Sequence, residues 1–570
     1  MKQHKLMGAI AFSGVLALAL AGCASGTGDN SGDGGDEPVE TQAADFNPQP
    51  RENLQQGGEV RFPINEIPEQ LNQFHSDGTA DTMRVAYWYM PQILLVSPEG
   101  ELSKNDAYLD EWKIEDVDGN TTVTFTFTDE AHWNDGTDMD WKSVENTWIA
   151  NRSSEEGYAP NATDGYKQIK TVEQGETAKT AVVTFDGEYA WPSMAFLTGG
   201  LVHPAINTPE LFNEAFIGEL HPEWGAGPYT VDKLDTNAGF VSFKPNPEWW
   251  GNEPLLDEVT FQAMEASASL NAYKNGEIDT VVAGSKDRLS QVEDVEDSVI
   301  YRAQQTAKTI IMVDADKPQF ADLDVRKAFF LGINIDQQKE IAWNGLGYEE
   351  EPAGSLNMYG FQEGYSDSFA EAGLKYDVEE AKKLLDEAGW VEGEDGIREK
   401  DGEKFTVTYP VFSDDPTQEA IAKSLQAQQK ELGIDLQIDI RPSTDFGADL
   451  TSKNWDVVGL RFTDSDPFGP AWFCQLYCSD SGLNLSATGT PEIDQKIKDE
   501  VESKTTAEEW TAASMKLEAE IIAETWGVIP LYNGPNITVA KKGLANLTPE
   551  PYVGQDLFGI TPVENVGWEK

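Results

Sequence analysis

A single apolar run at the start of the chain decides where the rest of it folds. Residues 7–20 are apolar and follow two positive side chains, Lys2 and Lys5. The run is too short and too close to the N-terminus for a membrane-spanning helix, and it has the pattern of a secretory signal. We therefore expect residues 1–22 to be removed and the remaining chain to fold outside the cytoplasm around a large core.

The end of this signal carries a short motif around Cys23. Residues 20–23 are Leu-Ala-Gly-Cys, which resembles the lipobox of bacterial lipoproteins, where cleavage precedes a cysteine that then carries a diacylglycerol. The motif predicts lipidation of Cys23 and a stable anchor on the outer face of the cell membrane, because two or more acyl chains hold a protein there. Cleavage elsewhere, which would leave Cys23 unmodified, is the alternative.

The stretch after Cys23 has the composition of a tether. Residues 24–50 are rich in Gly, Ser, Asp, Glu and Pro and show almost no apolar periodicity. Such a composition cannot offset the entropy lost on ordering. We expect residues 23–56 to form a disordered, acidic tether and the folded body to start near Gly57.

The charge balance excludes one large class of partners. The 570 residues include 41 Lys and Arg against 100 Asp and Glu, which gives a net charge of −59. Nucleic acid binding requires a cationic face and is excluded, and docking of the folded body on an anionic membrane is disfavoured. Plain solubility or a saline exterior would each explain the acidity, and the sequence leaves both open.

Two cysteines remain once Cys23 is assigned to lipid. Cys474 and Cys478 form an even pair in an exported chain, which predicts a disulfide that stiffens a local turn. A metal or redox site at this pair is the weaker alternative, because no second cysteine pair or nearby histidine completes it.

The rest of the chain alternates strand-like and helix-like patterns. Residues 122–128 and 181–185 have the alternation of half-buried strands. Residues 377–389 predict an amphipathic helix capped by Asp377 and ended by Gly389, and residues 417–432 predict another that leads into a strand at 434–438. This succession is typical of an α/β fold.

Local signatures of several enzyme classes are absent from the sequence. We find no His-Glu-x-x-His, no Walker A motif and no Gly-x-Ser-x-Gly. The five histidines are scattered at His4, His75, His132, His203 and His221, so we expect no metal and no cofactor. We also expect no enzymatic activity, and a surface-anchored hydrolase that uses a carboxylate pair is the remote alternative.

Several short motifs are spread along the chain from about residue 58 to residue 540. In order, they are His-Trp-Asn-Asp-Gly-Thr at 132–137 with Asp-Trp-Lys-Ser-Val at 140–144, Gly-Ala-Gly-Pro-Tyr at 225–229, Pro-Asn-Pro-Glu-Trp-Trp-Gly at 245–251, Asn-Gly-Glu-Ile-Asp at 275–279, Asp-Val-Arg-Lys-Ala at 324–328, Tyr-Asp at 376–377 with Ala-Lys-Lys-Leu-Leu-Asp-Glu-Ala-Gly at 381–389, and Ile-Pro-Leu-Tyr at 529–532. Their order and spacing resemble solute-binding protein family 5, the extracytoplasmic lipoproteins of oligopeptide, dipeptide and nickel ABC importers. Most are turns or helix ends, so we expect them to specify the fold rather than to touch ligand.

The resemblance implies a fold class. It is an α/β, two-lobed, periplasmic-binding-protein-like fold of type II, cluster C, with a hinge and an extra inserted domain. Mapped onto this chain, lobe I comprises residues 57–97, 223–304 and 530–570, the inserted domain residues 98–222, and lobe II residues 305–529. A ligand would lie buried between the lobes and stabilise their closed state.

The resemblance further implies a function and a site. The chain would capture oligopeptides or dipeptides, as a monomer, for delivery to a membrane ABC permease and its ATPase subunits. An oligosaccharide or another small solute is the alternative within the same fold, because aromatic faces stack on sugars and the chain holds 16 tryptophans. The predicted ligand-binding residues are Asp464, as the partner of a peptide's ammonium group, Asp466 in reserve, Phe462 and Trp472 on lobe II, and Gln92, Ile93 and Leu94 on lobe I.

Overall fold

The computed structural model describes residues 46–96, 102–197, 200–304, 307–360, 362, 364–463, 473–547 and 562–570. Residues Pro38–Lys570 form one compact unit. The predicted signal and Cys23 lie outside the described residues. Among the helices that are described, none combines the length and the apolar character needed to cross a membrane.

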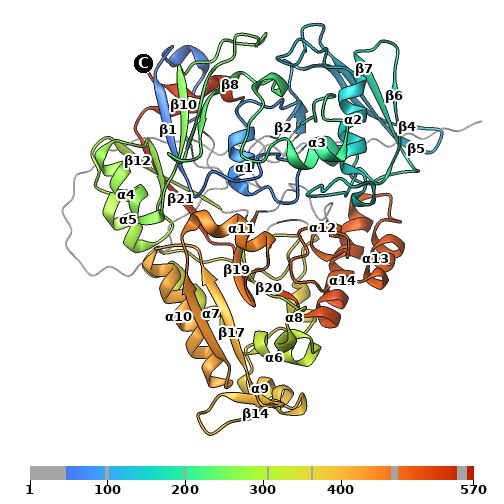
Figure 1. The fold of residues 1–570 in the computed structure, drawn as a ribbon. Coiled ribbons are helices and arrows are strands. Elements are labelled where there is room, and N and C mark those ends of the chain that lie inside the picture. Colours follow the sequence, from blue (N-terminus) through green and yellow to red (C-terminus); the bar gives the residue numbers. More distant parts are fainter. Residues whose placement is uncertain are drawn as a thin grey trace, which may run out of the picture. The chain divides into compact units, whose positions relative to one another are not determined.

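We use the name lobe I for residues 46–96, 223–304, 533–547 and 562–570, which contain two main sheets (Figure 1). In the first, β1 (Glu59–Ile64) runs parallel to β10 (Glu258–Ala263), and β9 (Phe240–Pro245) pairs antiparallel with β10 and with β8 (Tyr229–Asp235). In the second, β21 (Pro535–Lys541) lies between β11 (Thr280–Val282) and β12 (Ser298–Gln304). The helices α4 (Ala266–Asn275) and α5 (Lys286–Val292) pack against this second sheet.

The inserted domain, residues 102–222, interrupts lobe I. Its antiparallel sheet has the order β4-β5-β7-β6, with β4 at Leu109–Val117, β5 at Asn120–Phe127, β7 at Thr180–Phe185 and β6 at Ile169–Gln174. The helix α2 (Trp141–Asn151) packs against β6 and β7. Strands β5 and β7 pair with each other and confirm the two strands predicted from alternation, because their inward side chains are buried at Val123, Phe125, Val183 and Phe185.

Lobe II, residues 307–532, contains an antiparallel sheet in which β13 (Ala307–Val313) lies between β19 (Val457–Thr463) and β20 (Val528–Tyr532). Beside β19 lies the parallel pair β17 (Thr406–Val411) and β18 (Asp435–Ile440), which α10 (Pro416–Glu431) connects. The predicted helix-to-strand unit is therefore confirmed. Strand β20 spans the predicted boundary at residue 530 and pairs with β13 from Val528 to Tyr532, with one register shift, so this strand lies with lobe II.

The helix α9 (Val378–Glu387) shows how local chemistry sets an element. The Asp377 side chain accepts a hydrogen bond from the Glu380 amide at 3.0 Å, Leu384 and Leu385 are buried, and Gly389 takes a φ of +86° just beyond the helix. A carboxylate at the N-cap satisfies an amide that the helix leaves open, and glycine adopts this φ without strain. The predicted caps of this helix are confirmed.

Three of the sequence motifs meet where the inserted domain joins lobe I. The Asn246 side chain donates to Asn134 Oδ1 and to the Gly227 carbonyl, each at 2.8 Å. The Asn134 side chain in turn donates to the Pro222 carbonyl at 2.7 Å. Gly227 must lack a side chain, because a Cβ atom there would lie 2.8 Å from the Tyr89 backbone. These residues hold segments together, so their role is to specify the fold.

Further elements complete the two lobes and the inserted domain. They are α1 (Ala80–Ala86), β2 (Leu94–Val96), β3 (Leu102–Lys104), α3 (Pro209–Glu214), α6 (Leu323–Leu331), α7 (Ile335–Trp343), α8 (Ser368–Glu371), β14 (Val391–Glu392), β15 (Arg398–Lys400), β16 (Glu403–Lys404), α11 (Phe446–Thr451), α12 (Phe473–Tyr477), α13 (Pro491–Lys496), α14 (Ala507–Thr525), β22 (Leu544–Ala545) and β23 (Gly567–Trp568).

The predicted tether of residues 23–56 is wrong for residues 46–56. Leu54 is 3% exposed, the Gln55 amide donates to the Trp568 carbonyl at 2.8 Å, and the Arg51 side chain donates to the Glu564 carbonyl at 2.9 Å. The ordering contacts of this stretch come from the C-terminal end of the chain. Local composition cannot register such partners, which is why the stretch was predicted to be disordered.

We predict that Leu54→Ala destabilises the protein by about 2–3 kcal/mol, because it leaves a cavity against Leu255 and Ala545. Chemical denaturation followed by tryptophan fluorescence measures the loss. The matched control is Val391→Ala, at a residue that is 64% exposed, and it should change the unfolding free energy by no more than about 0.5 kcal/mol. Wild-type stability of the Leu54 variant would contradict the packing of residues 46–56.

Candidate functional site

The lobes are linked where the chain passes from one to the other. Asn533 and Gly534 form one link, between β20 and β21, and a second link between β12 and β13 runs through residues 305–306, outside the described residues. Glu350 of lobe II accepts hydrogen bonds from the amides of Asn533 at 2.7 Å and Gly534 at 2.8 Å. Burial raises the pKa of Glu350, and the two amides act in the opposite direction. This carboxylate fixes the described link to lobe II.

Beyond these links, lobe II meets the rest of the protein along a boundary that we call the seam. The inserted domain meets it through Asp164, whose Oδ1 accepts a hydrogen bond from the Cys474 amide at 3.3 Å, and through Lys167, which pairs with Glu502 at 2.6 Å. Burial raises the pKa of Asp164 to about 7, while the charge of Lys167 lowers it. A buried carboxylate therefore occupies this part of the seam.

Lobe I meets lobe II through two glutamates. Glu265 accepts a hydrogen bond from the Ser443 amide at 3.0 Å, and the Ser443 hydroxyl donates to the Asn65 carbonyl at 3.0 Å. Glu66 accepts a hydrogen bond from the Gly447 amide, and its pKa is raised to about 7, mainly by burial. Besides the contacts of Glu265 and Glu66, α4 and α5 of lobe I make a third set of contacts with the N-terminus of α10 in lobe II. A carboxylate is part of each set.

Three of the residues that we predict to bind ligand on lobe II lie outside the described residues, so their roles stay predictions. They are Asp464, Asp466 and Trp472. Phe462 is half-buried on β19, where it stands in register with Lys308 of β13.

Lys308 is a residue that our reasoning from sequence missed. It is 1% exposed, and its Nζ lies 3.5 Å from the centroid of the Tyr359 ring. An aromatic face stabilises a cation, and burial makes that stabilisation stronger. The signal was present in the sequence, since Lys308 is the one charged residue of the strand Ala307–Val313. It brings a buried positive charge to the strand beside Phe462.

The lobe I residues predicted to bind ligand are buried. Gln92, Ile93 and Leu94 are 8%, 0% and 1% exposed, and Ile93 and Leu94 belong to the main core. The carbonyls of Gln92 and Ile93 accept hydrogen bonds from the Asn105 side chain at 3.0 Å and from its amide at 2.9 Å. Core packing accounts for these side chains in the structure, and their contact with ligand stays a prediction.

Cys474 and Cys478 are bonded to each other in the structure, with their Cα atoms 4.8 Å apart. Phe473 and Tyr477 beside them are buried, and the Tyr477 hydroxyl donates to Glu518 at 2.8 Å, so both rings pack as core rather than as a pocket wall. Two groups of described side chains have ligand atoms within 4.8 Å of one another, Cys474–Cys478–Asp480 and Asp164–Cys474–Glu502. Both groups include the bonded sulfur of Cys474, which leaves too few ligands for a structural metal site.

An open groove of about 650 Å³ lies on lobe II, along α7 and the loop that follows it. Its lining includes Asp336, Glu340, Trp343 and Glu349. A site for a small solute encloses most of the ligand, whereas this groove is wide open. The seam is therefore the stronger candidate.

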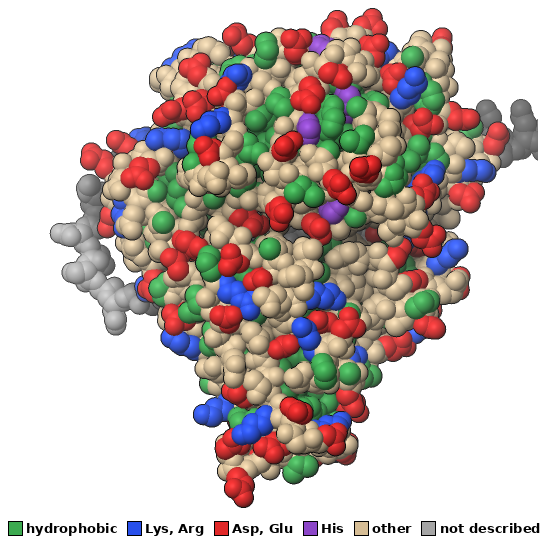
Figure 2. All heavy atoms as spheres, in the orientation of Figure 1, with side chains coloured by type: hydrophobic (Ala, Val, Ile, Leu, Met, Phe, Trp, Pro, Cys, Tyr) green, Lys and Arg blue, Asp and Glu red, His purple; other side chains and the backbone are tan. Residues whose placement is uncertain are grey.

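The surface carries the charge expected from composition. On the face shown in Figure 2, Asp and Glu side chains are spread over every part, and Lys and Arg lie singly or in small groups among them. This face does not offer the continuous cationic surface that nucleic acid requires.

Comparison with known families decides the class of the protein. A family model described as "Bacterial extracellular solute-binding proteins, family 5 Middle" matches residues 107–484. The chain belongs to this family. The matched residues include most of the inserted domain and most of lobe II. As a family 5 protein, the chain is a member of a family of solute-binding proteins rather than of enzymes.

Relatives of this family 5 protein share its length and fold. The oligopeptide-binding protein OppA of Mycobacterium tuberculosis is 28% identical over 93% of this chain and 90% of its own. The periplasmic EDTA-binding protein EppA has a TM-score of 0.76 at 22% identity, over 93% of this chain and 99% of its own. AppA of Bacillus subtilis, solved with a nonapeptide, has a TM-score of 0.75 at 18% identity, over 91% of this chain and 100% of its own. The predicted two-lobed α/β fold is confirmed.

Glu66 makes the stability of the seam depend on pH. Its pKa of about 7 in the folded protein exceeds that of an unfolded glutamate, so its stabilisation is present below about pH 4 and is lost as the pH rises through about 7. We predict that the stability advantage of Glu66→Gln over wild type grows by about 2 kcal/mol between pH 5 and pH 8. Denaturation at a series of pH values measures this growth.

The matched control for this prediction is Glu69→Gln, which makes the same charge change at an exposed position. The difference in unfolding free energy between this variant and wild type should change less over the same pH range than that of the Glu66 variant. If the unfolding free energies of the Glu66 variant and wild type change in parallel with pH, the seam does not hold this carboxylate out of water.

Proposed function

We propose that this chain is the substrate-binding protein of an ABC importer, that it captures oligopeptides or dipeptides between its lobes, and that it delivers them to a membrane permease with its ATPase subunits. The observation that carries this proposal is the similarity to the oligopeptide-binding protein OppA over 93% of the chain, which includes both lobes and the inserted domain. The proposal includes lipid anchoring through Cys23 on the outer face of the cell membrane and a monomeric state.

The arrangement of charge supports a ligand with two charged ends. Lys308 places a buried cation on β13, and Asp464 follows directly after Thr463, the last residue of the neighbouring strand β19. A short peptide carries an ammonium group at one end and a carboxylate at the other. A cation and a carboxylate on lobe II would together recognise the two ends of a peptide, because a ligand that lacks either charge would lose one of these interactions.

A small anionic chelate is the second candidate ligand. The observation that favours it is the TM-score of 0.76 to the EDTA-binding protein EppA. A buried lysine also suits a ligand that is rich in carboxylates. The peptide remains the first candidate because the relative with sequence similarity over nearly the whole chain is an oligopeptide-binding protein.

Native mass spectrometry of the mature chain, followed by denaturation and analysis of any released solute, tests the proposal. A spread of peptide masses would support a peptide importer component. A single chelate, a sugar or another small molecule would replace the peptide assignment while leaving the binding-protein class in place. If nothing is released, titration with short peptides decides the question.

We predict that Asp464→Asn weakens binding of a free-amine peptide about tenfold or more and leaves binding of the N-acetylated peptide unchanged, because the carboxylate pairs with the ammonium group. Calorimetric titration of both peptides measures the effect. Asp480→Asn, at an exposed acid of the same lobe, is the matched control. An unchanged preference for the free amine would remove Asp464 from this role and leave Asp466.

We predict the converse effect for Lys308→Met, which keeps an unbranched side chain of similar size and removes its charge. Binding of a peptide with a free carboxylate should weaken about tenfold or more, whereas binding of its C-terminal amide should change little. The thermal unfolding midpoint of the variant shows whether the core remains intact. An equal loss for both peptides would contradict the assignment of Lys308 to the ligand's carboxylate.

A further inference from the structure

The N-terminus of α4 in lobe I is capped by residues of lobe II. Its N-cap residue, Glu265, makes no side-chain hydrogen bond to its own helix and instead accepts one from the Ser443 amide across the seam at 3.0 Å. Ser267, in the first turn, donates to the Asp414 carboxylate of lobe II from its amide, at 3.1 Å, and from its hydroxyl. The first amides of a helix have no partner within it, and a carboxylate there is stabilising.

Arg288 lies beside this contact and is held by lobe I. Its Nε and Nη2 donate to the Val282 carbonyl at 3.1 and 2.8 Å, its Nη1 donates to the Ala266 carbonyl at 2.6 Å, and its Nη2 donates to the Ser269 hydroxyl at 3.1 Å. These partners are neutral, and the Arg288 side chain is only 11% exposed. Lobe I therefore presents a fixed, largely buried positive charge to the seam.

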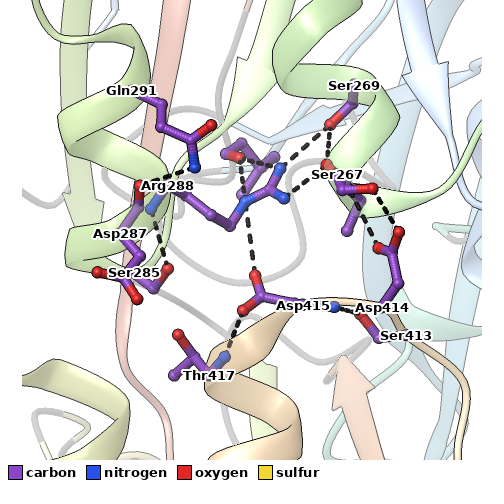
Figure 3. A network of polar contacts seen from close by, with 12 residues as sticks. Ser267, Ser269, Ser285, Asp287, Arg288, Gln291, Ser413, Asp414, Asp415 and Thr417 are labelled. Carbon is purple, nitrogen blue, oxygen red and sulfur yellow. Dashed lines mark hydrogen bonds and ion pairs between the residues drawn. The ribbon is translucent and has the colours of Figure 1, made fainter.

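Lobe II supplies the matching anion at the start of α10. Asp415 Oδ2 lies 3.7 Å from Arg288 Nε, and the Asp415 side chain is also 11% exposed. Its Oδ1 accepts a hydrogen bond from the Thr417 amide at 2.7 Å, and its own amide donates to the Ser413 hydroxyl at 3.1 Å. Figure 3 shows Asp414 and Asp415 reaching from this end of α10 toward Ser267 and Arg288.

Both sides of this contact are thus held in place by their own lobes. An ion pair between mobile side chains gains little, because its geometry must be ordered when it forms. Here the side chains of Arg288 and Asp415 are already held by their own lobes before the lobes meet, so little side-chain entropy is lost when the ion pair forms. The pair is also largely removed from water, where charges interact more strongly and salt screens them less.

We propose that Ser267 and Arg288 with Asp414 and Asp415 form a latch that stabilises the closed arrangement of the lobes without touching the ligand. The inference rests on the proposed function in one respect, that the lobes open and close around a solute. By raising the population of the closed state, the latch strengthens the binding of every ligand by the same factor. It sets affinity separately from specificity.

The first test measures lobe closure in the absence of ligand. The full mature chain, with Cys23→Ser to keep it free of lipid, is unfolded and refolded to remove bound solute and studied by small-angle X-ray scattering. Asp415→Asn keeps the helix cap, because asparagine is as good an N-cap as aspartate, and removes the charge that faces Arg288. We expect the ratio of open to closed molecules to rise about fivefold.

The matched control is Asp377→Asn, which makes the same change at the N-cap of α9, where the aspartate pairs with Lys375 of its own lobe. This variant should scatter as wild type does. Ser267→Ala, which removes the hydroxyl that donates to Asp414, tests the second half of the latch and should also favour the open form. Wild-type scattering from both the Asp415 and the Ser267 variants would overturn the proposal.

The second test measures affinity and separates this inference from the proposed function. If two unrelated ligands bind wild type, Asp415→Asn should weaken both by the same factor, and weakening of one ligand alone would overturn a latch that acts without ligand contact. If no peptide binds wild type, the proposed function fails, but the scattering comparison still decides the latch. Peptide binding with unchanged scattering would leave the proposed function standing and remove the latch.

Discussion

Carboxylates make many of the contacts between lobe II and the rest of this protein. Three carboxylates accept a hydrogen bond from a backbone amide of lobe II across the seam, namely Glu66, Glu265 and Asp164. Asp414 of lobe II accepts one from a backbone amide of lobe I. Taking a carboxylate out of water costs free energy that a single hydrogen bond only partly returns. In the proposed function, this cost keeps the buried Glu66 and Asp164 from locking the lobes together, so a ligand that touches both lobes can shift the equilibrium between open and closed states.

Buried cations stand out in a chain with 100 acidic residues. Lys308 lies over the Tyr359 ring, and Arg288 is held by carbonyls and a hydroxyl of its own lobe. Arg326 of the Asp-Val-Arg motif donates to the Thr525 carbonyl at 2.7 Å and ties α6 to the end of α14. Acidic residues are spread over the face shown in Figure 2, whereas these three positive groups are largely buried. In the proposals above, Lys308 meets the ligand and Arg288 holds the lobes together, while the hydrogen bond of Arg326 orders the fold.

Much of the local structure could be predicted because its causes are local. Caps and apolar spacing set α9 and α10, and alternation sets β5 and β7. The prediction failed for residues 46–56, since the Gln55 amide finds its partner at Trp568. It also missed Lys308, although a lysine within an apolar strand is visible in the sequence. Ligand contact by Gln92, Ile93 and Leu94 stays a prediction, since Ile93 and Leu94 belong to the main core and Gln92 is buried. The contacts of the seam come from other residues, whose partners are distant in the sequence.

The sequence by itself determined the family, the two-lobed α/β class and the turns and helix ends that specify it, because these depend on residues close together in the chain. Only the tertiary structure decided which carboxylates face the opposite lobe. The partner of Glu265 lies 178 residues away and that of Asp164 lies 310 residues away. In the sequence alone these acids cannot be told apart from the many others, and a hydrogen bond from a distant amide of lobe II is what distinguishes them.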